Sequence, residues 1–502
     1  MEREALSDLW TRGDAAAADR HTIDEIGVPS PVLMERAALA CVAAIERVRT
    51  GRPVHVLCGP GNNGADGVAI ARILHGRGVP VQVHVLAQRR GEGLAQQLMI
   101  AERIGVAMMD SLPVLTRSVV IVDAMLGTGA TPPLRDPYVG AVAWANAADA
   151  TRIAVDLPTG IDANTGAVPG PALRADVTVT FQRSKPGLHL TPGRASVGEL
   201  VVADIGLLSP GIGEASDRPV LLGPAQVRGW LAGLRPGAHK GERGHVAVVG
   251  GSAGTPGAAV LSGAAALRGG AGLVTIVSGD PEGQAQLLRH RPELMVMARG
   301  DPPAPAAVVL VVGPGLTQPA DRAGLDALYQ GDPRPAVWDA SALGEVPGTR
   351  TGGPRVLTPH PAEAARLLSL RTGRSWTTAD VQTDRLAAAR ALAAHTGAVV
   401  VLKGEGSVIA DATRVAIAVS GGPALATAGT GDCLAGLIGA LLARDLGAWE
   451  AAWAGVHVHW VAGEWLAHER IGAVAFEVAD TIGRVLAELP VTHPRWPRAH
   501  AG

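Results

Sequence analysis

Polar side chains follow three apolar runs in the first half of the chain, where they could do chemistry. Two asparagines and an aspartate follow VHVLC (54–58), and the runs VVIVDA (119–124) and RIAVDL (152–157) each have an aspartate near the end. These side chains are Asn62, Asn63, Asp66, Asp123, Asp156 and the nearby Thr159. Their oxygens could hold a hard cation, and Asp156 could transfer a proton. A lone aspartate there more often caps a helix or forms a turn, but three such strand ends favour a ligand site.

The turn CGPGNNGADG (58–67) has the spacing G-x-G-x-x-G at Gly59, Gly61 and Gly64. A dinucleotide-binding turn also needs an acidic residue about 20 positions further on, which holds a ribose hydroxyl. The sequence at that distance is VLAQRR, which has no acidic residue. An NAD-type phosphate turn is therefore disfavoured, while a structural turn and a ligand site that uses the Asn and Asp side chains both stay open.

A second candidate site lies in ATAGTGDCLAG (426–436). Gly429, Thr430 and Gly431 would open a helix that begins near Asp432, and backbone N–H groups at a helix N-terminus bind anions. Asp432 could accept a proton from a substrate hydroxyl as a phosphoryl group arrives, while the N–H groups neutralise charge. The alternative is a Gly-rich turn that Asp432 caps. The sequence contains no G-x-x-x-x-G-K-[ST], which excludes a P-loop enzyme.

Lysine and asparagine are rare enough for their positions to matter. Only Lys185, Lys240 and Lys403 are lysine among the 44 lysines and arginines. Arginine serves as the general cation, so these three positions are candidates for a compact ammonium. Two of the four asparagines, Asn62 and Asn63, stand side by side in the first candidate site.

Length and composition indicate a globular protein of two domains, with three as the alternative. The chain has 502 residues, of which 47% are hydrophobic and 18% are charged. The net charge of −2 argues against a nucleic-acid partner or an anionic membrane surface. Cys41, Cys58 and Cys433 form no C-x-x-C pair, which disfavours a disulfide framework or a zinc knuckle and favours a reducing, cytoplasmic setting.

The sequence predicts neither a signal peptide nor a membrane span. The N-terminus is charged within its first four residues and lacks an apolar core. The stretch most like a membrane span, 419–443, contains Pro423, several glycines and Asp432, and its helical part is too short to cross a bilayer. We therefore expect a soluble protein without a membrane partner.

Strands that alternate with helices predict α/β architecture in both halves of the chain. We expect a leading helix with Ser30 as its cap, and parallel strands covered by helices on both faces. Residues 206–220 are rich in Gly, Pro and Ser without an apolar period, so we place a domain boundary there. The predicted strands are 54–58, 81–87, 119–124, 152–157 and 176–181 before the boundary, and 245–251, 272–278, 306–315, 335–340, 355–360 and 398–404 after it.

The motifs of the first half resemble a known family. GNNGADG, VDAMLGTG, VDLPTGID, TVTFQRSKPGL and GELVVADIG are similar to the YjeF N-terminal family of NAD(P)HX epimerases, over most of residues 20–206. The resemblance implies a Rossmann-like three-layer α/β/α domain over residues 1–214. It also implies a potassium ion held by Asn63, Asp123 and Thr159, with Asp156 as the acid/base and Lys185 assisting. The implied binding residues for the damaged cofactor are Asn62, Asn63, Gly64, Ala65, Asp66, Gly127, Thr128, Gly129, Ala130, Thr131, Pro132, Pro133 and Asp156.

The motifs of the second half resemble another family. HKGERGHVAVVGGS, VVGPGL, LTPHPAEAARLL, VVLKGEG and ATAGTGDCLAG are similar to the ADP/ATP-dependent NAD(P)HX dehydratases of the ribokinase-like superfamily. The resemblance covers nearly all of residues 220–490 and implies a ribokinase-like α/β domain over 220–502, with Asp432 catalytic. The residues implied for the adenine nucleotide are Lys403, Gly404, Glu405, Gly406, Ser407 and Gly431, with Gly429 and Thr430 beside them. The residues implied for the hydrated cofactor are Ala258, Gly315, His360 and Asp432.

Four positions depart from the family patterns. Ala65 stands where the first family usually has Gly, and Thr159 where it has Ser. Thr159 keeps the hydroxyl oxygen, so we expect the ion site to persist. In the second family's pattern Ser341 replaces the second Asp of D-A-D, and Glu405 brings a negative charge into a loop of small residues. The first change could weaken a metal or structural contact, and the second makes the nucleotide contact less certain.

Together the two resemblances imply repair of hydrated nicotinamide cofactors. An isomerase would interconvert the R and S forms of NADHX and NADPHX, and a lyase would dehydrate the S form with ADP or ATP through a phosphorylated intermediate. The single-chain fusion favours ADP, and K+ and Mg2+ are the implied ions. We expect a homo-oligomer. The alternative is a ribokinase-like kinase of a small alcohol fused to a non-catalytic nucleotide-binding module.

Overall fold

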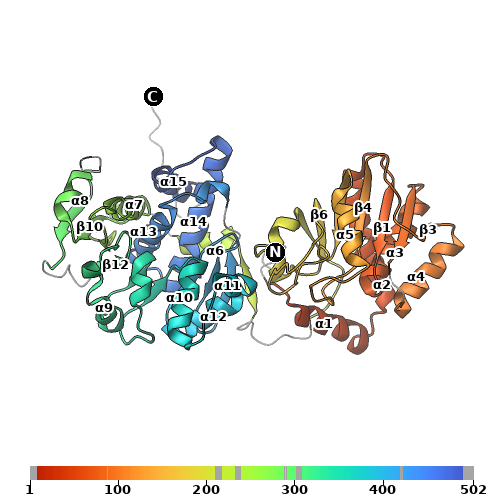
Figure 1. Cartoon of the computed structure of the whole chain (residues 1–502), viewed down its shortest axis with the longest axis horizontal. Coiled ribbons are helices and arrows are strands. Elements are labelled where there is room, and N and C mark those ends of the chain that lie inside the picture. The colour runs from red at the N-terminus through yellow and green to blue at the C-terminus, as the bar shows by residue number, and fades with distance from the viewer. Residues whose placement is uncertain are drawn as a thin grey trace, which may run out of the picture. The chain divides into compact units, whose positions relative to one another are not determined.

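The computed structural model describes residues 8–86, 89–209, 218–231, 239–287, 289, 291–300, 308–418 and 422–489. The chain divides into two compact units, Met1–Val220 and Leu221–Gly502, each with helices around a sheet of its own (Figure 1). Among the described helices, none is long and apolar enough to span a membrane.

The first unit is built on a seven-stranded sheet in which all neighbouring strands run parallel. The strands are β1 (Val54–Cys58), β2 (Val81–Val85), β3 (Ala107–Met109), β4 (Val119–Ala124), β5 (Ala150–Val155), β6 (Val177–Phe181) and β7 (Glu199–Ala203). Their order is β3-β2-β1-β4-β5-β6-β7, so the direction of winding reverses between β1 and β4. In open α/β sheets, ligands bind beyond the carboxyl ends of the strands at such a reversal.

Helices cover both faces of this sheet. They are α1 (Arg12–Arg20), α2 (Ser30–Arg49), α3 (Asn62–Gly76), α4 (Glu92–Arg103) and α5 (Tyr138–Ala147). Successive strand residues point to opposite faces. Val56 accordingly packs in one core with α2, α3 and α4, whereas Leu57 packs in a second core with α5. The predicted three-layer α/β/α architecture is therefore confirmed.

The second unit is built on a ten-stranded sheet of order β11-β10-β9-β12-β13-β14-β15-β16-β17-β8. The strands are β8 (Pro219–Leu222), β9 (His245–Val249), β10 (Leu273–Ser278), β11 (Met295–Ala298), β12 (Val308–Val312), β13 (Ala336–Trp338), β14 (Arg355–Leu357), β15 (Val399–Leu402), β16 (Val408–Ala410) and β17 (Val415–Ala418). In this order, all neighbouring strands from β11 through β10 and β9 to β15 run parallel. Strands β16 and β17 then extend the sheet with antiparallel pairing.

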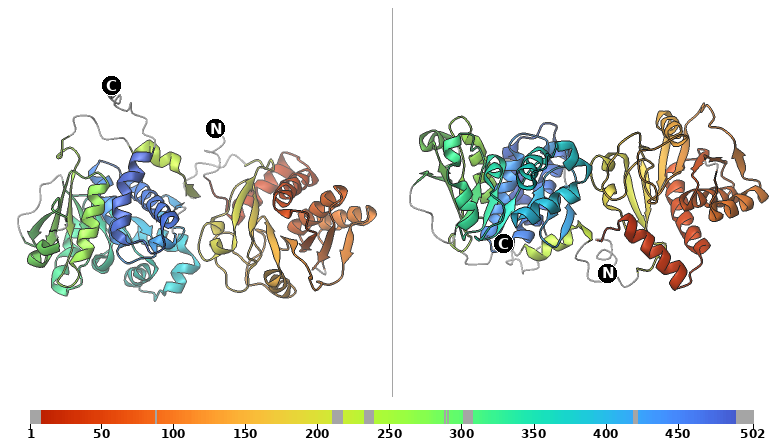
Figure 2. Two further views of the ribbon diagram at one scale, coloured as in Figure 1. Left: turned by 90° about the horizontal axis from the view of Figure 1, so that it is seen from above. Right: turned by 60° about the horizontal axis from the view of Figure 1, so that its bottom comes forward.

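Helix α13 is the most buried helix of this unit, because it packs against α7 and α14 and against strands β9 and β12. A Cβ on its Gly436 would lie 1.9 Å from the Ser262 carbonyl oxygen of α7, so only glycine allows this approach. Figure 2 shows the helices of each unit around its own sheet. The helices of the second unit are α6 (Pro224–Trp230), α7 (Pro256–Arg268), α8 (Pro281–Leu287), α9 (Leu325–Gly331), α10 (Pro361–Thr372), α11 (Thr378–Thr383), α12 (Arg385–Thr396), α13 (Thr430–Ala443), α14 (Ala448–Glu469) and α15 (Ala475–Glu488).

Most differences from the predicted elements lie at their ends. The predicted cap Ser30 is wrong, since Ser30 is the first helical residue of α2 and Pro29 precedes it without a side-chain hydrogen bond. The helix expected near Asp432 begins at Thr430, because Gly429 takes a left-handed conformation as the N-cap. The predicted series of alternating strands and helices did not include β3, β7, β8, β11, β16 and β17, which are short or lie near sheet edges. Parts of the predicted segments, namely 87, 210–217, 306–307 and 419–421, lie outside the described residues.

Candidate functional site

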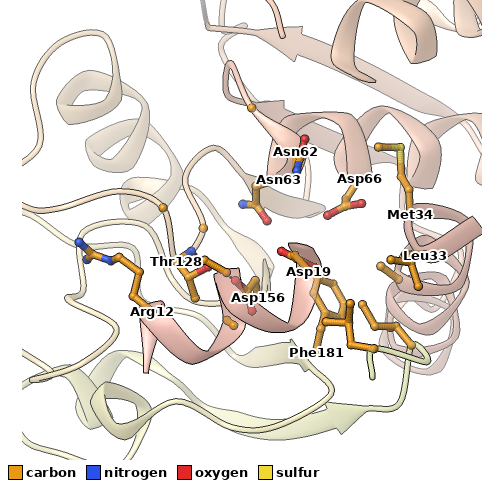
Figure 3. A pocket seen from close by; sticks show the side chains of 18 of the residues that line it. Arg12, Asp19, Leu33, Met34, Asn62, Asn63, Asp66, Thr128, Asp156 and Phe181 are labelled. Carbon is orange, nitrogen blue, oxygen red and sulfur yellow. Dashed lines mark hydrogen bonds between the residues drawn. The ribbon is translucent and has the colours of Figure 1, made fainter. Parts of the chain in front are cut away.

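A cavity of about 580 Å³ lies in the first unit, where the sheet's winding reverses. The first turn of α3 and the loop after β4 contribute polar groups, and Leu33, Met34 and Phe181 contribute apolar ones (Figure 3). Eight of the sequence-predicted binding residues line it: Asn62, Asn63, Asp66, Gly127, Thr128, Gly129, Ala130 and Asp156. Such a mixture suits a ligand with both a planar apolar part and charged groups.

Five other predicted residues do not line the cavity, namely Gly64, Ala65, Thr131, Pro132 and Pro133. A Cβ on Gly64 would lie 2.0 Å from the Gly59 carbonyl oxygen, so glycine is required for the turn. Ala65 is fully buried in the core. Thr131 accepts a hydrogen bond from Arg12 at 2.6 Å, in the same loop as Pro132 and Pro133.

Asp156 is held rigidly at the cavity by four partners. Its φ of +70° is a left-handed conformation that Asp tolerates better than most residues. Oδ1 accepts hydrogen bonds from the Lys185 ammonium at 2.7 Å and the Thr180 hydroxyl at 3.3 Å, and Oδ2 accepts one from the Thr128 N–H at 3.3 Å. Its own N–H donates to Val179 at 2.8 Å. The carboxylate is thus oriented for proton transfer beside a compact cation.

Lys185 is 2% exposed, and its ammonium also donates to the Thr180 hydroxyl and to the Phe181 carbonyl oxygen. A buried cation needs such partners, because removal from water is costly. The sequence marked Lys185 through the rarity of lysine and through the family resemblance, and the structure places it against the candidate acid/base.

Two further carboxyl groups face the same space. In Figure 3, Asp19 and Asp66 point into the cavity near Asp156. Burial raises the pKa of Asp66 well above its usual range, and the Asp156 and Asp19 charges raise it further. Burial and Asp156 also raise the pKa of Asp19. Sequence reasoning missed Asp19, because it lies in the Ala-rich α1 and before the region of family resemblance.

Of the three predicted potassium ligands, Asn63 lines the cavity, while Asp123 and Thr159 are buried and contact each other. Asp123 is fully buried and accepts hydrogen bonds from the Thr159 hydroxyl and N–H, both at 2.8 Å. Burial raises its pKa to about 6, although these hydrogen bonds and one from the Met125 N–H lower it. The carboxamide nitrogen of Asn63 is buried without a hydrogen-bond partner. The buried Asp123 carboxylate has the oxygen ligands that a hard cation prefers, whereas the unpartnered Asn63 nitrogen is a hydrogen-bond donor and not a ligand atom.

In the second unit, Lys403 connects the candidate catalytic groups. Its ammonium donates to Asp339 at 2.7 Å and lies 4.0 Å from Glu363, and a Cβ on Gly431 would lie 3.4 Å from it. Burial raises the pKa of Asp432 to about 7, and the charges of Asp339 and Glu363 add to the rise while Lys403 lowers it. An aspartate with a pKa near neutrality at a helix N-terminus is suited to accept a proton.

The remaining predicted residues occupy neighbouring turns. His360 is the N-cap of α10, where its Nδ1 accepts from the Ala362 and Glu363 N–H groups. A Cβ on Gly315 would lie 3.2 Å from the Cβ of Ala258, so the loop after β12 touches α7. Gly404, Glu405, Gly406 and Ser407 follow Lys403 in the loop between β15 and β16.

Sequence reasoning missed Asp339 and Glu363. Asp339 directly follows β13 and is 2% exposed. It could have been found by the strand-end argument that selected Asp123 and Asp156. Glu363 lies inside the quoted motif LTPHPAEAARLL, where its carboxylate accepts from the His360 N–H at 2.8 Å. Its nearness to Lys403 depends on the tertiary fold.

Comparisons with known proteins cover both units. The family model for the YjeF-related protein N-terminus matches residues 30–187, and the model for NAD(P)H-hydrate dehydratase matches residues 246–484. The bifunctional NAD(P)H-hydrate repair enzyme Nnr of Escherichia coli (strain K12) is 37% identical over 499 residues, which are 95% of this chain and 94% of that protein. The Moorella thermoacetica enzyme of the same name is 38% identical over 524 residues, 96% of this chain and 97% of that protein.

A solved structure is similar to the second half. The ADP/ATP-dependent NAD(P)H-hydrate dehydratase from Bacillus subtilis, co-crystallised with ATP/Mg2+, is 29% identical and covers 54% of this chain and 99% of its own, with a TM-score of 0.49. The full-length matches to two-domain relatives carry the assignment: this chain belongs to the family of bifunctional NAD(P)H-hydrate repair enzymes.

Proposed function

We propose that the first unit interconverts the R and S forms of NADHX and NADPHX, and that the second unit dehydrates the S form to NADH or NADPH. The observation that carries the proposal is that each unit has an aspartate whose surroundings would suit it to proton transfer. Asp156 lies beside Lys185 in the first unit, and Asp432 lies at the N-terminus of α13 in the second. The domains are proposed to span 1–214 and 220–502, supported by the two compact units.

In the dehydratase, Asp432 accepts the proton of the substrate's C6 hydroxyl as that oxygen takes a phosphoryl group from ADP or ATP. Phosphate then leaves C6 with the C6–O bonding electrons while solvent takes a proton from C5, which restores the C5=C6 double bond. Phosphorylation is needed because hydroxide is a poor leaving group. The N-terminus of α13, with Gly429, Thr430 and Gly431, would neutralise charge on the transferred group.

The nucleotide is proposed to bind the loop 403–407, with ADP preferred as in single-chain fusions. Among the described residues, no cluster of three or more His, Cys, Asp or Glu side chains could hold a metal ion. Magnesium would bind with the nucleotide phosphates and would neutralise part of their charge. The protein's own contribution is the Lys403 ammonium and the N–H groups of α13.

A product balance tests this reaction against the small-alcohol kinase. With ADP as donor, dehydration of the S hydrate releases one AMP and one inorganic phosphate for each NADH formed. We measure all three after limited turnover. A kinase that makes a stable phosphorylated alcohol would instead release AMP without inorganic phosphate or NADH, which would contradict the proposal.

The dehydration rate is expected to depend on pH through Asp432. Since its pKa is raised to about 7 and the base must be ionised, kcat/KM should fall about tenfold per pH unit below pH 7. A pH profile of kcat/KM for the S hydrate at saturating nucleotide measures this acid limb. A limb near pH 4, the ordinary range of an aspartate, would contradict the expectation.

In the epimerase, Asp156 moves the proton, and Asn63, Asp123 and Thr159 are proposed to hold potassium. The ion would supply a fixed positive charge beside the substrate's binding loop. The buried Asp123 carboxylate and its contact with the Thr159 hydroxyl support this assignment. Lys185 orients Asp156 and neutralises its charge through the 2.7 Å contact.

Thr159→Val should weaken the activation of epimerisation by potassium. The substitution keeps the volume but deletes the hydroxyl that contacts Asp123, so the half-activating potassium concentration should rise about tenfold or more. Epimerisation is followed against KCl with choline chloride keeping the ionic strength constant. Thr159→Ser, which retains the hydroxyl, is the matched control. Equal potassium dependence in both variants would overturn the ligand assignment.

A cytoplasmic location and a homo-oligomeric state are also proposed. All three cysteines are buried and free, which supports a reducing compartment. Sedimentation analysis of the purified chain tests the oligomeric state, and a mass equal to one chain would contradict it.

A further inference from the structure

Arg385, the first residue of α12, is a charged side chain inside the second unit that no motif marked. It is 1% exposed. Its Nη2 donates to three carbonyl oxygens, at Leu402 (3.1 Å), Lys403 (3.3 Å) and Gly406 (3.3 Å), and its Nη1 donates to Gln382 at 3.0 Å. All three carbonyls belong to the end of β15 and the following loop. The guanidinium thus lies inside that loop.

A buried guanidinium that bonds to neutral carbonyls is energetically expensive. Burial lowers the pKa of Arg385 to about 10, although the charge of Glu405 acts in the opposite direction. An apolar side chain would fill the same volume at lower cost. The planar fork, however, bonds several oxygens in one plane, which neither an apolar side chain nor a lysine can reproduce.

The loop is shaped around the guanidinium. Gly404 has a φ of +148°, and a Cβ on it would lie 2.6 Å from Nη1 of Arg385. The Ser407 hydroxyl donates to the Gly404 carbonyl oxygen at 2.9 Å, on the other side of the turn. The arginine therefore fixes the path of the chain from Lys403 to Ser407.

This path decides where Lys403 and its neighbours point. The Lys403 N–H donates to Pro359 at 2.9 Å, and its ammonium reaches Asp339 at 2.7 Å beside Gly431. We propose that Arg385 is a positioning residue that holds the loop 403–407 in the conformation that binds the adenine nucleotide. This inference rests on the proposed nucleotide binding by that loop.

Arg355 offers a matched control within the same unit. It is also 1% exposed, and its guanidinium also bonds backbone carbonyls, among them Tyr329 at 3.0 Å, Asp332 at 2.7 Å and Arg334 at 2.7 Å. None of these carbonyls belongs to the loops that surround Lys403 and Asp432. Arg355→Lys should therefore disturb the fold as Arg385→Lys does, without moving the nucleotide loop.

The test compares steady-state dehydration of the S hydrate by wild type, Arg385→Lys and Arg355→Lys, with ADP and with ATP. We expect Arg385→Lys to raise the KM for nucleotide about tenfold, with the KM for the hydrate within about twofold of wild type. Arg355→Lys should leave the nucleotide KM unchanged at a similar loss of melting temperature. Equal nucleotide KM values for the two variants would overturn the inference.

If Arg385→Lys does not fold, Gly404→Ala tests whether contact with Arg385 positions the nucleotide loop. Its added methyl group would push the loop away from the guanidinium, so the nucleotide KM should rise in the same selective way. An unchanged nucleotide KM in Gly404→Ala would overturn the inference. Absence of dehydration by the wild type with either nucleotide would instead overturn the proposed function.

Discussion

Asp432→Asn should lower kcat/KM for dehydration of the S hydrate by about 10²–10⁴-fold, the range for loss of a positioned general base. Asparagine has nearly the same shape but cannot accept the hydroxyl proton. The helix N-terminus and Lys403 remain, so binding of nucleotide and hydrate should change little. Initial rates of NADH formation from the purified S hydrate give the size of the effect.

The other end of the same helix provides the control for this variant. Asp445 follows α13, is exposed, and has a φ of +65° that asparagine also tolerates. Asp445→Asn should retain wild-type dehydration. The epimerase activity of Asp432→Asn, measured on the same sample, should also be unchanged. More than half of the wild-type dehydration rate in Asp432→Asn would contradict the catalytic assignment.

Asp156→Asn should lower the rate of epimerisation by about 10²–10⁴-fold, while dehydration of the S hydrate continues at the wild-type rate. Asparagine accommodates the left-handed φ of +70° and can still accept from Thr128, so the cavity should persist. The lost group is the carboxylate that Lys185 holds at 2.7 Å. Conversion of the purified R hydrate to the S hydrate, followed by chromatography without nucleotide, measures the effect.

Asp149→Asn is the control in the first unit, because Asp149 is exposed just before β5. Its epimerisation rate should equal that of the wild type. If Asp156→Asn epimerised the R hydrate within about tenfold of the wild type, proton transfer would have to be assigned to another group of the cavity. Asp19 and Asp66, whose pKa values are raised, would then be the candidates.

The sequence predicted much of the architecture because the central strands are buried on both faces. Strands such as β1 and β4 are entirely buried and, apart from His55 and Asp123, consist of apolar residues. Strand β7 is partly exposed, and its residues Glu199–Ala203 give a weaker pattern. Edge and antiparallel strands depend on neighbours from elsewhere in the chain, which a local pattern cannot show.

The candidate site was predictable where a polar residue ends a buried strand. Asp123 and Asp156 follow this rule, and Asp339 follows it as well although the motifs drew attention to Ser341 instead. Arg385 and Asp19 carry no local signal, since each stands in an Ala-rich helical segment. Their importance depends on contacts with residues such as Gly404 and Asp156 that are distant in sequence.

The central claim is that one chain carries both repair steps. The most direct measurement is the recovery of NADH absorbance from a chemically prepared mixture of R and S NADHX, with wild-type protein, ADP, magnesium and potassium. The account predicts recovery well beyond the S fraction, because the R hydrate is converted and then dehydrated. Recovery that stops at the S fraction would contradict epimerisation by the first unit, and no recovery with either ADP or ATP would contradict the account as a whole.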